Sequence, residues 1–309
     1  MSVVVVGSAN LDTVYRLDSI PSPGETVLAT GSDAVPGGKG NNQAVAAARA
    51  GAAVSFVVAL GTDAAGDALA AAAREARIRL HARRVDEPTG TAVIMVDRRA
   101  ENAIVVDSGA NRSLVDLDED ELALVAGADV LLLQLETPMS TVAAAAAHAH
   151  ASGTTVVLNA APARPVPPGV LDVVDVLIVN EHEAAVVAEE ENGRAGDASH
   201  HDLAARLTGR GSAVIVTLGA RGALVAVPGE PPVHVPGFPV TAVDTTGAGD
   251  TFCGALAAAL DREESGRDLR VLLRAAQFAT AAAALSVQRP GAVPSIPTLE
   301  EIDDFRASH

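Results

Sequence analysis

Short runs of valine, leucine and isoleucine recur along the chain, and alanine-rich segments with polar residues at helical spacing separate them. The apolar runs predict strands at 3–6, 54–60, 130–134, 155–158, 176–179 and 214–218. The alanine-rich segments predict helices at 41–50, 63–77, 141–151, 181–190, 201–208, 269–287 and 299–305. Buried strands that alternate with helices are typical of a parallel sheet covered on both faces. We therefore predict a three-layer α/β/α fold with a mainly parallel central sheet, as a single domain over residues 1–309.

Two segments depart from this alternation. Residues 13–36 contain Pro21, Pro23 and Gly24 between short alternating pieces, and residues 91–96 and 103–106 flank a polar turn. We predict that they form a small β-sheet lid, from about 13–36 and 90–107. Another hairpin, 224–227 with 233–235, is expected at one edge of the central sheet.

Composition narrows the functional classes. A formal net charge of −17 argues against nucleic acid as a partner, because phosphate backbones are bound by clustered lysine and arginine. No apolar run approaches the roughly 20 residues that span a bilayer, so no membrane association is expected. The start of the chain has no basic region before its valine run, and Cys253 is the single cysteine. These features favour a cytoplasmic protein.

The segment DTTGAGD at 244–250, followed by an alanine-rich helix, is the most informative motif. Gly247, Ala248 and Gly249 would leave backbone N–H groups free at the helix start, where the helix dipole also favours an anion. Asp250 would stand beside this phosphate cradle and suits the deprotonation of an attacking hydroxyl. The alternative is an N-cap aspartate after a glycine turn.

Lys39 is the only lysine in the sequence and lies in the glycine-rich segment PGGKGNNQ at 36–43. This segment is not a Walker A loop, because Gly40 rather than serine or threonine follows the lysine. Its glycines would let the backbone approach a small ligand, while Lys39 and Asn42 add donors. Asn10 and Asp12 follow the first strand and could bind adjacent sugar hydroxyls, although turn formation explains them equally well.

Three further strand ends carry polar residues. Glu136 follows the strand at 130–134. Asn180 and Glu183 could lie near a magnesium–phosphate group, although a helix cap explains the same spacing. The segment TLGARG at 217–222 could line a nucleotide pocket or simply form a tight hairpin.

Together these segments resemble the ribokinase-like family of sugar kinases, also called the phosphofructokinase-B family. The resemblance runs nearly end to end and rests on an ordered set of segments: 7–12, 23–26, 37–47, 134–136, 180–183, 217–222, 235–238 and 291–297. It implies ATP-dependent phosphorylation of D-ribose at its 5-hydroxyl. Asp250 would be the base, and the amides of Gly247, Ala248 and Gly249 would form the anion hole.

The same resemblance implies the ligand contacts. The sugar would be held by Asn10, Asp12, Gly38, Lys39, Gly40, Asn41, Asn42, Glu136 and Asp250. ATP would be contacted by Asn180, Thr217, Leu218, Gly219, Ala220, Arg221, Gly222, Gly249 and Thr280. Glu183 would hold Mg²⁺ through water.

A K⁺ site and a homodimer are also implied by the resemblance. The K⁺ ligands would be the side chains of Asp244 and Ser295 and the carbonyls of Thr246, Ser286, Arg289 and Gly291. Pro290 departs from the family pattern but leaves the Arg289 carbonyl available. The homodimer would form through the β lid.

Other functions stay open at this point. Fructokinase and deoxyribokinase activities would use the same machinery. A nucleoside kinase is disfavoured, because five Phe, one Tyr and no Trp provide few stacking surfaces. A non-catalytic sugar-binding protein would be expected to lack Asp250 or the anion hole, and a nicotinamide enzyme would need a G-x-G-x-x-G turn that is missing here.

Overall fold

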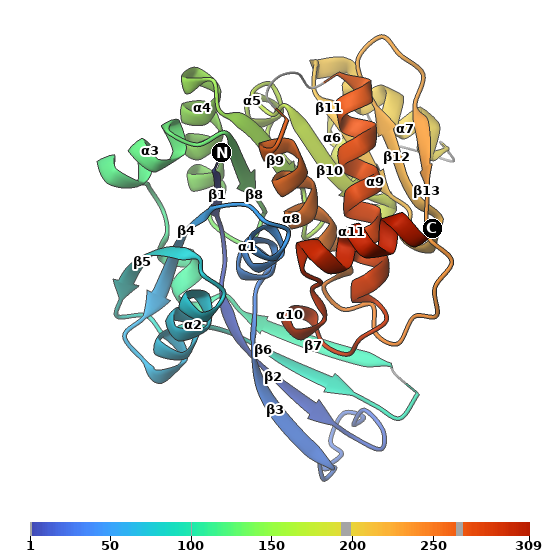
Figure 1. Ribbon diagram of the computed structural model, residues 1–309. Coiled ribbons are helices and arrows are strands. Elements are labelled where there is room, and N and C mark those ends of the chain that lie inside the picture. Colours follow the sequence, from blue (N-terminus) through green and yellow to red (C-terminus); the bar gives the residue numbers. More distant parts are fainter. Residues whose placement is uncertain (1, 100, 193–198, 264–267) are drawn as a thin grey trace.

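A computed structural model describes residues 2–99, 101–192, 199–263 and 268–309 (Figure 1). Its large sheet has nine strands in the order β13-β12-β11-β10-β9-β8-β1-β4-β5. These strands are β1 (Val3–Val6), β4 (Val54–Gly61), β5 (Arg79–Val85), β8 (Val130–Leu133), β9 (Thr155–Asn159), β10 (Val176–Asn180), β11 (Ala213–Thr217), β12 (Gly222–Ala226) and β13 (Val233–Pro236). All neighbours are parallel except β11–β12 and β12–β13, so the mainly parallel sheet and its antiparallel edge hairpin are confirmed.

Helices cover both faces of this sheet because its strands are apolar on both sides. Val3 and Val5 of β1 pack into one core layer, and Val4 and Val6 pack into the other. The first layer is covered by α1 (Lys39–Arg49), α2 (Ala64–Glu75), α8 (Ala248–Asp261), α9 (Leu269–Ser286) and α11 (Leu299–Ser308). The second is covered by α3 (Glu119–Ala126), α4 (Met139–Ser152), α5 (Pro168–Leu171), α6 (Glu181–Asn192) and α7 (His200–Leu207). The three-layer α/β/α fold is confirmed.

Short elements complete the chain. They are the helix α10 (Ala292–Ser295) and the 3-10 turns η1 (Gly109–Ser113), η2 (Thr208–Arg210) and η3 (Gly219–Arg221). None of the helices in the described part of the chain combines the length and the apolar character needed to cross a bilayer.

The edge strand β5 is missing from the elements predicted above. Its seven residues include Arg79, Arg83 and Arg84, which hide the alternating pattern of a strand. The strand forms because it pairs in parallel with β4 on one side only, where an exposed edge tolerates charged side chains.

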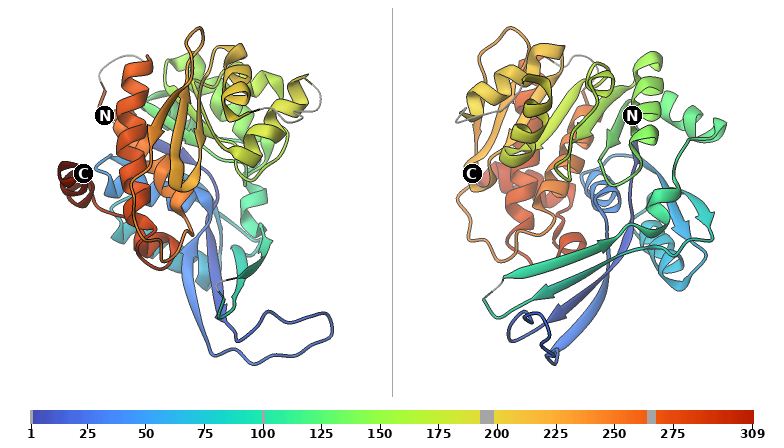
Figure 2. Two further views of the ribbon diagram at one scale, coloured as in Figure 1. Left: turned by 90° about the vertical axis from the view of Figure 1, so that its right-hand side faces the viewer. Right: turned by 180° about the vertical axis from the view of Figure 1, so that it is seen from behind.

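The small sheet has four strands in the order β3-β2-β6-β7 and projects from one end of the main body (Figures 1 and 2). The strands are β2 (Asn10–Arg16), β3 (Gly31–Gly37), β6 (Gly90–Val96) and β7 (Asn102–Asp107). β2 runs parallel to β6, and the other pairs are antiparallel. The alternative explanation that Asn10 and Asp12 only form a turn is wrong. Both residues belong to β2, and its pairing with β3 and β6 holds them in an extended conformation.

Candidate active site

The start of α8 brings the predicted phosphate cradle together. Gly247 is the N-cap residue and adopts a φ of 75°, a left-handed conformation that glycine tolerates best. The N–H of Ala248 donates to the carbonyl of Thr245 at 3.2 Å. Gly247 and Gly249 line a polar cavity together with Asp250, whereas Ala248 faces a neighbouring apolar cavity. Gly247 and Gly249 are therefore the two cradle residues placed toward the polar cavity.

Asp250 is buried and held by two side-chain amides from the first turn of α1. Asn42 Nδ2 donates to Oδ2 and Gln43 Nε2 donates to Oδ1, each at 3.0 Å. The two helices approach this closely because Gly254 has no Cβ, which would lie 2.4 Å from the carbonyl oxygen of Gln43. Asn42 was predicted to hold sugar, but its amide nitrogen is directed at the candidate base.

Two acids lie on the side of the small sheet. Glu136 Oε2 accepts hydrogen bonds from Ser8 Oγ at 2.5 Å and from the Lys39 N–H at 2.9 Å. Asp12 lies nearby on β2, where burial and the neighbouring Glu136 raise its pKa to about 7. The buried Oδ1 of Asp12 has no hydrogen-bond partner within the described chain. An unpaired buried acceptor of this kind suits a ligand hydroxyl.

Asn111 in η1 is a site residue that was missed from the sequence. Its Oδ1 accepts from the N–H of Ala9 at 2.9 Å, and its Nδ2 donates to Asn10 Oδ1 at 2.8 Å. Because Asn10 Oδ1 accepts from Asn111, the side-chain Nδ2 of Asn10 can donate to a ligand. The short run around Asn111 carries no helix or strand pattern, so only its tertiary contacts identify it.

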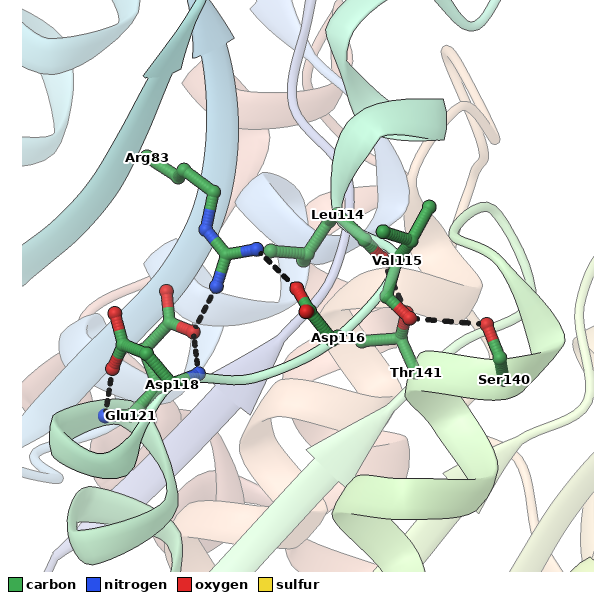
Figure 3. Close-up of polar contacts among 8 residues, drawn as sticks. All are labelled: Arg83, Leu114, Val115, Asp116, Asp118, Glu121, Ser140 and Thr141. Carbon is green, nitrogen blue, oxygen red and sulfur yellow. Dashed lines mark hydrogen bonds and ion pairs between the residues drawn. The ribbon is translucent and has the colours of Figure 1, made fainter.

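An ion-pair cluster anchors the segment that follows η1. Figure 3 shows Arg83 of β5 donating to Asp116 at 2.8 Å and to Glu121 at 2.5 Å. On the other side, the hydroxyl of Thr141 donates to the carbonyl of Leu114. Both contacts are made by the segment directly after η1, the turn that carries Asn111.

Two adjoining cavities lie at the carboxyl ends of the strands, where ligands collect in open α/β sheets. The apolar cavity, of about 230 Å³, is lined by residues that include Phe238, Phe252 and Thr280. The polar cavity, of about 330 Å³, is lined by Lys39, Asn180, Glu183 and Asp250 among others. Thr217, Gly219 and Gly249 line both, so the two cavities lie side by side.

The backbone of Lys39 contacts the sugar-side acid Glu136, while the residue also lines the polar cavity. Asp250 and Glu183 line this cavity with it. The carboxylate of Asp250 raises the pKa of the Lys39 ammonium, and Glu136 and Glu183 act in the same direction against the effect of burial. The ammonium stays charged and suits an anionic ligand in this cavity.

Asn180 and Glu183 form the helix cap that was one of the two interpretations of their spacing. The N–H of Asn180 donates to Glu183 Oε2 and the N–H of Glu183 donates to Asn180 Oδ1, both at 2.8 Å. Both residues also line the polar cavity, so the cap does not remove them from the site. Burial raises the pKa of Glu183.

The remaining predicted nucleotide contacts divide into two groups. Gly219, Ala220, Gly222 and Thr280 line the apolar cavity. Arg221 and Leu218 line neither cavity; Arg221 pairs with Glu181, and the N–H of Leu218 donates to the carbonyl of Gly222. Among the predicted sugar contacts, Gly38 is the N-cap residue of α1, while Gly40 and Asn41 are buried in its first turn.

The predicted K⁺ ligands come from the loop before α8, the end of α9, the loop after it and the end of α10. Asp244 Oδ1 accepts from the N–H of Thr246 at 2.9 Å, and its Oδ2 accepts from the N–H of Gly291 at 2.8 Å. Burial raises the pKa of Asp244, but these hydrogen bonds outweigh it and hold the pKa below its usual value. Ser286 and Ser295 are buried and lie within five positions of Gly291 in the sequence. The N–H of Arg289 donates to the carbonyl of Ser286. An ionised carboxylate among oxygen ligands fits a monovalent cation.

Across the described ranges, no three or more His, Cys, Asp or Glu residues cluster in a way that could hold a metal ion. Glu183 lines the polar cavity beside Asp250, and so does Glu181, which pairs with Arg221. Any Mg²⁺ there would depend on phosphate oxygens and waters for most of its ligands.

The fold and this site define a carbohydrate kinase, and residues 1–299 match the pfkB family of carbohydrate kinases. The chain belongs to that family. It is similar to the ribokinase of Haemophilus influenzae, with 40% identity over 98% of each chain. It is also similar to the crystal structure of ribokinase from Thermotoga maritima, with 35% identity, a TM-score of 0.89 and 99% of each chain covered. The structure of Arabidopsis thaliana ribokinase complexed with ribose and ATP has 34% identity, a TM-score of 0.86 and 98% coverage of each chain.

Proposed function

We propose that the protein transfers the γ-phosphoryl group of ATP to the 5-hydroxyl of D-ribose, giving ribose 5-phosphate and ADP. The observation that carries this proposal is the position of the first turn of α1. Its Lys39 N–H contacts Glu136 on the sugar side, while its Asn42 and Gln43 amides contact Asp250 at the polar cavity. One helical turn thus joins a hydroxyl-binding region to a phosphate-binding region. The similarity to ribokinases then favours ribose as the sugar.

In the proposed reaction, Asn10, Asp12 and Glu136 hold the ribose hydroxyls and direct the 5-hydroxyl at Asp250. As the new O–P bond forms and the bond to the ADP oxygen breaks, Asp250 accepts the hydroxyl proton. The amides at the start of α8 and the Lys39 ammonium stabilise the charge on the transferring group. The apolar cavity accepts the adenine.

Two cations complete the proposal. Mg²⁺ neutralises phosphate charge when bound, and Glu183 would hold one of its waters. K⁺ would lie between the loop at Asp244 and the loop at Gly291, beside the start of α8. Asp244, Ser295 and the carbonyls of Thr246, Ser286, Arg289 and Gly291 would hold it there.

We also propose a homodimer through the small sheet, which would act as a lid over the sugar. Ile104, Val105 and Val106 of β7 are 53%, 63% and 53% exposed. Three consecutive exposed apolar residues place apolar surface on both faces of the strand, and a second copy of the chain would cover it. The cytoplasm, where ATP is supplied, is the proposed location.

The test is ATP consumption by the purified protein with Mg²⁺ and K⁺ against ribose, deoxyribose, fructose and adenosine. A clear preference for ribose in kcat/KM supports the proposal. A preference for fructose, deoxyribose or adenosine would support kinase activity but reject ribose as the preferred substrate. Sugar binding without ATP consumption would indicate a non-catalytic binding protein.

A further inference from the structure

A chain of buried side-chain amides contacts Asp250 through Gln43, which lines neither cavity. Gln134, which follows β8, donates from Nε2 to Gln43 Oε1 at 2.7 Å. Gln43 in turn donates from Nε2 to Asp250 Oδ1 and to Asn159 Oδ1 at the end of β9, each at 3.0 Å. Gln43 and Gln134 are 0% and 1% exposed, so water does not compete for these contacts. Strand ends of the large sheet are thereby connected to the candidate base.

The direction of the hydrogen bonds fixes the orientation of the Gln43 amide. A flipped amide would place Oε1 against the Asp250 carboxylate and the Asn159 carbonyl oxygen, and it would place two N–H groups against the Gln134 donor. In the observed orientation the Gln43 amide donates to both acceptors and accepts from Gln134 Nε2, while Gln134 Oε1 has no partner within the described chain. The two acceptors on one side and the Gln134 donor on the other therefore favour the same orientation of the Gln43 amide, with its nitrogen toward Asp250.

We propose that Gln43 is a positioning residue for Asp250, and that Gln134 keeps Gln43 in the orientation that this role requires. The inference rests on the proposed function, because it concerns the group that accepts the hydroxyl proton. A carboxylate held at only one oxygen can rotate about the bond to its Cβ atom. Asp250 is held at Oδ2 by Asn42 and at Oδ1 by Gln43, so the plane of the carboxylate is fixed.

Kinetics of the variant Gln43→Met test this role. Methionine keeps the approximate volume and removes the amide, so we expect kcat to fall by about 10- to 100-fold through misorientation of the base. The KM for ribose and the dissociation constants of ribose and ATP should change less than about threefold, because Gln43 does not line either cavity. Gln134→Met should give a smaller fall in kcat, since it only releases the Gln43 amide to rotate.

A double-mutant cycle with Asp250→Asn separates positioning from a general loss of structure. If Gln43 acts through the base, Gln43→Met should have almost no effect on the residual turnover of the Asp250→Asn protein. An equal loss of turnover in both backgrounds would overturn the proposal, and so would an unchanged kcat in Gln43→Met alone.

Gln43→Glu provides a variant of matched shape in case Gln43→Met does not fold. The introduced carboxyl group can donate to Asp250 only when it is protonated. The turnover of Gln43→Glu relative to wild type should therefore be higher at about pH 6 than at about pH 8. A ratio that does not change with pH would contradict the proposed hydrogen bond. Ribose-dependent turnover by the wild-type protein is measured in parallel. Its absence would reject the proposed function, whereas the variants decide the role of Gln43.

Discussion

Asp244 Oδ2 accepts the N–H of Gly291 at 2.8 Å, and this bond joins the loop before α8 to the loop after α9. The same carboxylate accepts the N–H of Thr246, directly before the N-cap residue of α8. A cation bound between these loops would therefore influence the cradle that faces the phosphates.

We expect replacement of Na⁺ by K⁺ to stimulate the wild-type protein and to have no effect on Asp244→Asn. The amide of the variant keeps the shape but removes the negative charge that a monovalent cation requires. Initial rates at constant ionic strength provide the measurement. Equal K⁺ stimulation of the two proteins would place the cation elsewhere.

Asp250→Asn should reduce kcat with ribose by about 100- to 10,000-fold, the range typical of a lost general base. The dissociation constant of ATP should stay close to that of wild type, because the isosteric amide preserves the cavity. Single-turnover kinetics and calorimetry provide the two values. Turnover within twofold of wild type would show that another group takes the proton.

Lys39 was predicted to hold sugar, but it lines the polar cavity together with acids. We therefore expect Lys39→Met to lower kcat/KM for ATP by about 100-fold, while the dissociation constant of ribose changes little. Lys39→Arg keeps the charge and serves as the matched control. A selective loss of ribose affinity in Lys39→Met would instead support the sugar-binding role predicted from the sequence.

Asp12 should make stability depend on pH. Its pKa is raised from 3.8 to about 7, so between these values the folded protein holds a proton that the unfolded chain has released. The free energy of unfolding should therefore fall as pH rises from about 4 to about 7 and level off above, since the unfolded state binds fewer protons in that window. Urea denaturation at several pH values checks this, with Asp12→Asn as the control. Identical pH slopes for the two proteins would contradict it.

Ile104 and Val105 are neighbours on β7 and point to opposite faces of the small sheet. If the sheet mediates a homodimer, one of the variants Ile104→Asp and Val105→Asp should be monomeric in analytical ultracentrifugation, because a buried charge is costly at an apolar interface. The affected variant also identifies the face that forms the interface. Dimers in both variants would reject this surface as the interface.

The large sheet could be predicted from the sequence because both faces of its strands are covered, which produces uninterrupted runs such as Val3–Val6. β5 could not, because an edge strand with several arginines lacks such a run. For the site, Asp250 and the glycines before it form a local pattern that indicates their chemistry. The contacts of Gln43 and Asn111 cannot be predicted in this way, because their partners lie 207 and 101 positions away in the chain.

The division of the site between α1 and the small sheet has a consequence for redesign. The first turn of α1 contacts the base through Asn42 and Gln43, so exchanging its residues would damage the chemistry of every substrate. Asn10 and Asp12 lie on β2, which pairs with β3 and β6, whereas the side-chain amides that hold Asp250 come from α1. A change of sugar preference is therefore best sought by grafting or randomising strands of the small sheet, while the residues of α1 are kept unchanged.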